Sequence, residues 1–184
     1  MSVTAQQRRA RQTVRNLILS LLATIGVTLL IVLGVPRDDS NRITEVDYQQ
    51  IATEAETSLG IELLVPQIPE GWWSNAARLD RELGVDVWYL GFVTGENQYI
   101  GLSYAWESNP SWEALTLQGN WFEDELQIGA RNWEIWPTLT PSSPPGSKEN
   151  ALLLKLDGGA VVIYGTAPIE DLISLAEAID GELR

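Results

Sequence analysis

The chain is 184 residues long, contains neither histidine nor cysteine, and has a formal net charge of −13 at pH 7. Without these two residue types, Ser-His-Asp and Cys-His catalytic sites, zinc sites of ordinary composition and disulfides are excluded. The sequence also lacks a P-loop and a dinucleotide-binding glycine motif in a strand–turn–helix context. We therefore expect no cofactor and no machinery for phosphoryl or hydride transfer.

An uncharged apolar run, LILSLLATIGVTLLIVLGV at residues 17–35, follows a basic N-terminus. As a helix it would be about 28 Å long, close to the ~30 Å hydrocarbon core of a bilayer. We predict a transmembrane helix anchored by aliphatic residues that include Leu17, Leu22, Val27 and Leu33. A cleaved signal peptide is the alternative, but its apolar region is usually only ~7–15 residues long and ends at an A-x-A-like site, which is absent here.

Charge changes sign across this run. Arg8, Arg9, Arg11 and Arg15 precede it, and no acidic residue does. The positive-inside rule therefore predicts that residues 1–16 form a cytoplasmic tail and that the C-terminal part is extracytoplasmic. That part contains eight basic and twenty-five acidic residues, a formal charge of −17. Such a surface repels nucleic acid, so no nucleic-acid partner is expected.

Residues 36–43 are predicted to be an exposed linker, beginning with Pro36, which ends the membrane helix. Residues 44–184 are long enough for one domain with a single core. Thr44 is expected to cap the first helix of this domain, and Gly60 to end it. The apolar stripe of that helix comprises Tyr48, Ile51, Ala52, Ala55 and Leu59.

Two apolar hairpins are the strongest strand signals in the domain. Residues 85–94 and 99–106 are rich in β-branched and aromatic residues, and a Gly-Glu-Asn-Gln turn joins them. Residues 151–156 and 160–164 are apolar at nearly every position, and Asp-Gly-Gly separates them. We predict that this second hairpin lies at the centre of the sheet, covered on both sides.

Weaker signals complete the sheet. Residues 79–84 are expected to contain a turn, and short strands are expected at 126–128 and 132–138. Pro137 either makes the latter an edge strand or marks its end. The polar stretch 140–150 is predicted to be a surface loop.

Helical signals flank these strands. Ser111 is expected to cap a short helical turn around Trp112, and Pro168 to begin a last helix that ends at Gly181. The apolar stripe of the last helix comprises Leu172, Leu175, Ala176 and Ile179. The predicted fold class is α+β: one N-terminal transmembrane helix, then a domain whose antiparallel sheet of about five to seven strands is packed by N- and C-terminal helices.

Tryptophan is unusually frequent, with eight residues against two phenylalanines. Most are expected to fill the core, because tryptophan buries a large area. Others could form a platform that stacks on sugar rings or grips a peptide or a lipid tail. Trp72, Trp73 and Trp136 are the candidate binding residues, because proline or turn residues flank them.

Two motifs connect the chain with a known family: PQIPEGW at residues 66–72 and GTAPIEDL at residues 165–172. On these motifs and the order of elements around them, the chain resembles an uncharacterised family of actinobacterial single-pass membrane proteins, a domain of unknown function. The resemblance implies one membrane span and a Gram-positive envelope. It implies no catalytic residues, because the family has no established activity.

Three functions are compatible with these features. The first is a non-catalytic binding or scaffold protein of the cell envelope, which contacts another envelope protein or cell-wall glycan. The second is a hydrolase of cell-wall glycan that uses two carboxylates. The acidic residues near tryptophans that could serve it are Glu107, Glu113, Glu123, Asp124 and Glu125. The third is an accessory subunit of a membrane sensing complex, with Gly26 and Gly34 as close-packing points.

Overall fold

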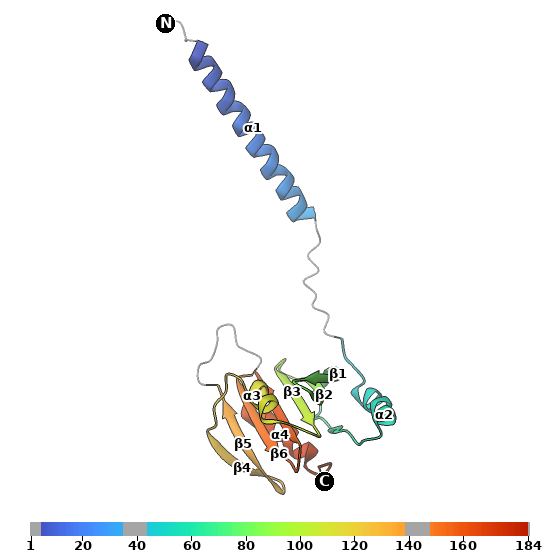
Figure 1. Cartoon of the computed structure of the whole chain (residues 1–184). Coiled ribbons are helices and arrows are strands. Elements are labelled where there is room, and N and C mark those ends of the chain that lie inside the picture. The colour runs from blue at the N-terminus through green and yellow to red at the C-terminus, as the bar shows by residue number, and fades with distance from the viewer. Residues whose placement is uncertain (1–4, 35–43, 139–147, 184) are drawn as a thin grey trace. The chain divides into compact units, whose positions relative to one another are not determined.

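A computed structural model describes residues 5–34, 44–138 and 148–183 (Figure 1). The chain divides into two units, Met1–Arg42 and Ile43–Arg184. The first contains helix α1 (Ala5–Gly34), and the second contains helices α2 to α4 and strands β1 to β7. The predicted linker at residues 36–43, which includes Pro36, lies outside the described residues. Most of the predicted polar loop, residues 140–147, also lies outside them.

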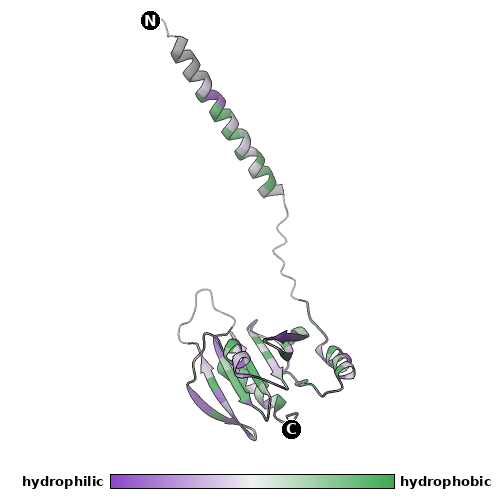
Figure 2. Cartoon of the chain, viewed as in Figure 1, coloured by the Kyte–Doolittle hydropathy of each residue, from purple (hydrophilic) through white to green (hydrophobic). Residues whose placement is uncertain are grey.

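Helix α1 has a segment, Thr13–Ile31, that is long and apolar enough to cross a membrane by length and composition. Figure 2 shows a purple, hydrophilic stretch near the start of this segment, followed by green and pale colours along the rest. Leu17, Leu22 and Val27 are exposed on this helix, which is typical of a surface that needs lipid or another protein around it. The side chain of Leu33 lies outside the described ones. Because α1 begins at Ala5, the arginines used to predict topology belong to the same helix.

Helix α2 (Tyr48–Leu59) begins later than the sequence predicts. Asp47 caps it instead of Thr44, and its carboxylate accepts a hydrogen bond from the backbone N–H of Gln50 at 3.0 Å. The preceding residues lie outside the helix, and the N–H of Val46 donates to the carbonyl of Ser74 at 2.8 Å. Gly60 ends the helix in the left-handed conformation, with a φ of 70°, as predicted.

The seven strands form one antiparallel sheet in the order β1-β2-β3-β7-β6-β5-β4. The strands are β1 (Trp73–Glu82), β2 (Val85–Val93), β3 (Tyr99–Ala105), β4 (Asp124–Ile128), β5 (Arg131–Pro137), β6 (Asn150–Lys155) and β7 (Ala160–Gly165). The two apolar hairpins are β2–β3 and β6–β7, and they meet where β3 pairs with β7. The predicted α+β fold is confirmed.

Strand β1 was not predicted. Residues 79–84 do not form the expected turn: β1 runs to Glu82, and only Leu83 and Gly84 turn, with φ values of 49° and 81°. β1 is an edge strand that pairs with β2 along its length. Its polar sequence, WSNAARLDRE, lacks the alternating pattern that predicts a strand, because several of its side chains stay in solvent. Pairing with β2 satisfies its backbone hydrogen bonds instead.

One smaller expectation is corrected, and one open alternative is decided. Helix α3 (Pro110–Thr116) is capped by Asn109 and not by Ser111, since the Asn109 side chain accepts from the N–H of Trp112 at 2.9 Å. Proline then occupies the first turn, where its missing N–H costs nothing. Of the two roles predicted for Pro137, the structure confirms the second: Pro137 ends β5, which lies between β4 and β6 and is not an edge strand.

The two faces of the sheet are covered unequally. The first, which we call the α2/α4 face, packs against α2 and against α4 (Ile169–Asp180). The predicted stripe of α4 is buried there. The second, the α3 face, packs against Trp112 and Leu117 at and just after the seven-residue helix α3. So short a helix covers only part of a seven-stranded sheet, and hollows lie beside it.

Candidate functional site

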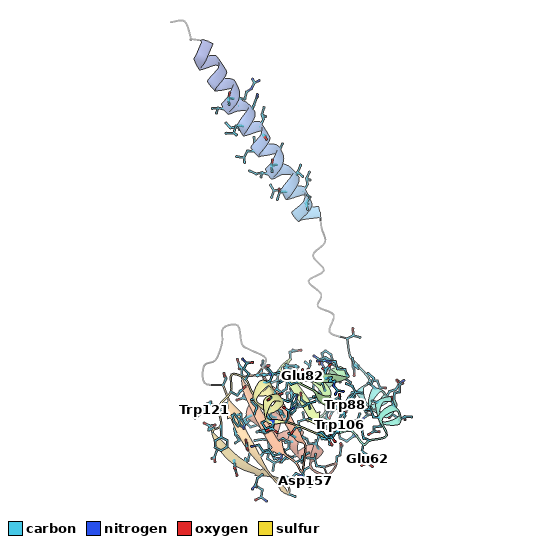
Figure 3. All side chains as sticks on the ribbon, viewed as in Figure 1. Glu62, Glu82, Trp88, Trp106, Trp121 and Asp157 are labelled. Carbon is cyan, nitrogen blue, oxygen red and sulfur yellow. The ribbon has the colours of Figure 1, made fainter. Side chains whose placement is uncertain are left out.

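The structure separates the tryptophans into core and surface residues. Trp88, Trp112 and Trp133 are fully buried, and the indole N–H of Trp88 donates to the carbonyl of Leu64 at 2.9 Å. Trp121 is 43% exposed (Figure 3). The remaining four are partly buried: Trp72, Trp73, Trp106 and Trp136. Three of the eight tryptophans are therefore core residues, as expected for most of them, and four more are partly buried.

Trp136 lines a groove of about 360 Å³ beside α3. Strands β5 and β6 provide Trp136, Leu153 and Lys155, and α3 with the turn after it provides the opposite wall. The polar residues of that wall are Glu113, Gln118 and Asn120. We call this the Trp136 groove. Its volume lies at the lower end of the ~300–1,000 Å³ of small-molecule sites.

The Trp136 ring is held in place by its neighbours. Its indole N–H donates to one oxygen of Glu134 at 3.0 Å, and Lys155 donates to the other oxygen of Glu134 at 2.8 Å. The ring of Phe122 meets it edge-on at 5.9 Å between centroids. Because Glu134 and Trp136 alternate with inward residues of β5, both project from the α3 face. The ring is thus oriented before any ligand binds.

Asn120, which lines the same groove, is fixed by two hydrogen bonds. Its amide nitrogen donates to the carbonyls of Trp136 at 2.9 Å and Lys148 at 3.0 Å. Its side-chain oxygen is buried and has no partner among the residues that the structure describes.

Trp72 lines a different cavity, of about 400 Å³, which we call the Trp72 pocket. Four carboxylates surround it: Glu70, Glu96, Glu170 and Asp171. Burial raises the pKa of Asp171, and the nearby charges of Glu96 and Glu170 raise it further. One carboxyl group of this pocket therefore holds its proton more tightly than an ordinary aspartate.

The Trp72 pocket joins parts of the chain that are far apart in sequence. Glu70 and Trp72 belong to the motif at 66–72, and Glu170 and Asp171 to the motif at 165–172. Glu96 comes from the turn between β2 and β3. The two motifs that carry the family resemblance thus meet at one cavity. Sequence reasoning singled out both motifs but missed this site, because no local pattern relates them.

The three candidate tryptophans are not brought together. The Trp136 groove and the Trp72 pocket share no lining residue. Trp73 begins β1 opposite Val93 and lines neither of these two cavities. A binding role for these tryptophans therefore stays a prediction. It now concerns two separate cavities, one lined by Trp72 and the other by Trp136.

Most carboxylates named for the hydrolase hypothesis are exposed and line neither the Trp136 groove nor the Trp72 pocket. Glu113 lines the Trp136 groove, whereas Glu107 and the acidic run 123–125 are exposed. Among the described residues, no group of three or more acidic side chains is arranged to hold a metal ion.

Comparison with known proteins places these features in a family. The chain matches the family described as "Protein of unknown function (DUF4245)" over residues 9–179. No curated protein and no solved structure matches it. The family match covers nearly all of the chain and confirms the resemblance to a domain of unknown function. The chain belongs to the DUF4245 family.

Proposed function

We propose that this protein is a non-catalytic binding protein of the bacterial cell envelope, anchored by α1 with its C-terminal domain outside the cytoplasmic membrane. The apolar segment Thr13–Ile31 supports the anchor. The four arginines at or before its start, Arg8, Arg9, Arg11 and Arg15, support this orientation. The family resemblance supports an actinobacterial, Gram-positive envelope as the setting.

We further propose that the Trp136 groove binds cell-wall glycan. A sugar ring has an apolar C–H face, which stacks on an indole, and hydroxyl groups, which bond to amides and carboxylates. The groove offers an oriented indole beside Glu113, Gln118 and Asn120. The observation that carries the proposal is the fixed Trp136 ring at the wall of this groove.

Glycan retention tests the proposed ligand. The full chain, purified in detergent, is sedimented with isolated cell-wall glycan. We expect retention by the wild type and a loss of about tenfold or more in affinity for Trp136→Ala, as for a central aromatic contact. Trp121→Ala is the matched control, because Trp121 is exposed and does not line the groove. Equal retention of both variants would contradict the assignment, as would a wild type that is not retained.

The topology is tested separately. A phosphatase that is active only outside the cytoplasm, fused after Arg184, is expected to be active in intact cells. The matched fusion before residue 17 is expected to be inactive. An inactive C-terminal fusion, or release of the mature chain into the medium, would overturn the proposed localisation.

The Trp72 pocket favours a second candidate function, a carboxylate-dependent glycan hydrolase. Glycosidases pair a carboxylic acid of raised pKa with a second, ionised carboxylate. Asp171 fits the first role, and Glu96 is a candidate for the second. Incubation with cell-wall glycan should then release soluble fragments, and Asp171→Asn should abolish the release while leaving glycan retention intact. No release by the wild type would eliminate this candidate.

A further inference from the structure

A third cavity lies on the α3 face, towards the edge strand β1. It has a volume of about 210 Å³ and adjoins the Trp136 groove on the β5–β6 side, with which it shares the lining residue Gln118. We call it the Lys148 cavity. Strands β1, β2, β3 and β7 provide Arg78, Tyr89, Ser103 and Tyr164, and Lys148 closes it near α3. Two cations therefore face one small cavity in a strongly acidic domain.

Lys148 is unusual among the described basic residues of this unit. The others each have a carboxylate oxygen within 4.0 Å, and they are Arg78, Arg81, Arg131 and Lys155. The half-buried ammonium of Lys148 instead donates to the carbonyl of Thr116 at 2.7 Å and lies 5.0 Å from the centre of the Tyr164 ring. Burial lowers its pKa, and the charge of Glu82 opposes this shift only in part. A desolvated cation without a paired carboxylate is costly, and a bound anion would offset that cost.

Arg78 faces the same cavity with spare donors. Its guanidinium lies 3.9 Å from the centre of the Tyr89 ring, and its Nε donates to Asp80 at 2.7 Å. In the described part of the chain, its two terminal amino groups have no hydrogen-bond partner. Arginine in this state presents a planar pair of N–H groups that suits carboxylate and phosphate oxygens.

The rings beneath both cations form one packed base. The hydroxyls of Tyr89 and Tyr99 are 2.5 Å apart, and the rings of Tyr99 and Tyr164 meet edge-on at 6.3 Å. A Cβ on Gly101 would lie 2.6 Å from the Tyr99 hydroxyl and 3.0 Å from the Tyr164 ring. Glycine at this position thus gives the tyrosines their room on the sheet. The cations rest on a rigid support, which lowers the entropy cost of ordering them around a ligand.

We propose that the Lys148 cavity binds a small oxyanion, a carboxylate or a phosphate group, between Lys148 and Arg78. Lys148 supplies a point charge with N–H groups left over, and Arg78 supplies a fork of donors. The carboxylate of Asp80 is already engaged by Arg78, and Glu82 lies at the cavity wall. The Glu82 charge favours a singly charged group over a more highly charged one.

Anion-dependent melting of the full chain in detergent tests this site. Acetate and inorganic phosphate are the probes, each compared with chloride at equal ionic strength. We expect at least one of them to raise the melting temperature saturably, and Lys148→Gln and Arg78→Gln to weaken the apparent affinity by about tenfold or more. Arg81→Gln is the control, because Arg81 pairs with Asp86 on the surface and should leave the response unchanged.

The outcomes separate the sources of the oxyanion. A response to acetate alone assigns a carboxylate ligand, a response to phosphate alone a phosphate, and a response to both the shared oxyanion chemistry. If Lys148→Gln does not fold, Lys148→Arg keeps the charge and should retain the response. A wild type that responds to neither probe, or an Arg81→Gln variant that loses as much as Lys148→Gln, overturns the proposal. Glycan retention is a separate readout, so either proposal can fail alone.

Discussion

The two faces of the sheet differ in how completely they are covered. On the α2/α4 face, two twelve-residue helices pack on the sheet, and residues such as Trp88, Trp133 and Leu172 have no exposed surface. On the α3 face, one seven-residue helix leaves the Trp136 groove and the Lys148 cavity beside it. The same strands thus provide a closed core beneath α2 and α4, where the Trp72 pocket lies only at the start of α4, and two open sites on the α3 face.

Because of this difference, the two faces are expected to contribute differently to stability and to ligand binding. Complete burial on the α2/α4 face supplies most of the hydrophobic stabilisation. The α3 face keeps partly buried aromatic and charged groups, which contribute less to folding and are available for contacts with ligands. Substitutions on the two faces should therefore separate stability from binding.

The largest expected effect lies on the closed face. Trp88→Ala removes a fully buried ring and its hydrogen bond to Leu64. We expect the free energy of unfolding to fall by about 3–5 kcal/mol, measured by chemical denaturation of the chain. A loss below ~1 kcal/mol would mean that this core can collapse around the cavity, and the contrast between the faces would weaken.

The matching substitution on the open face is Trp136→Ala. The ring is only partly buried, so we expect a loss of about 1–2 kcal/mol in the free energy of unfolding. Its main consequence should be the loss of glycan retention described above. A loss as large as that of Trp88→Ala would indicate that the ring is chiefly a core residue.

Alkaline pH should weaken the tyrosine base of the Lys148 cavity. Burial raises the pKa of Tyr99 above its ordinary value of 10.0, and that of Tyr164 likewise. Since the folded state holds these protons more tightly, their contribution to stability is complete below pH ~10 and is lost as pH rises towards the folded pKa values.

The opposite shift at Lys148, whose pKa is lowered by burial, makes the folded state more stable as its proton leaves. Because several buried tyrosines oppose this one lysine, we expect a net fall. Melting temperatures from pH ~8 to ~11.5 measure it, and Tyr99→Phe should flatten the curve. An equally steep fall in Tyr99→Phe would show that other groups control alkaline unfolding.

The smallest expected effect concerns Asp171. Its raised pKa means that ionisation is disfavoured in the folded state, so its stabilising contribution is present only at low pH and is lost as pH rises through the folded pKa. Asp171→Asn should therefore raise the melting temperature slightly at pH 7, with no gain in acid. Glu177→Gln is the control, because Glu177 lies on the same helix but does not line the Trp72 pocket. A lower melting temperature for Asp171→Asn would contradict this reading of the Trp72 pocket.

Part of the fold was predictable because it follows local patterns. The β6–β7 hairpin is apolar at most positions and is central, and the stripe of α4 is buried as its spacing indicates. β1 was not predictable, because its strand conformation depends on pairing with β2 and not on its own side chains. The cap of α2 shifted because the residues before Asp47 are held by a contact to Ser74, which lies far along the chain.

By itself, the sequence determined the apolar helix, the fold class, the main hairpins and Trp136 as a residue of interest. Hydrophobic spacing specifies which side of an element is buried, and that information is local. Only the tertiary structure decided that Glu70, Glu96 and Asp171 share one pocket and that Arg78 and Lys148 share another. Strand order and register bring such distant residues together, and they depend on long-range packing that no local pattern encodes.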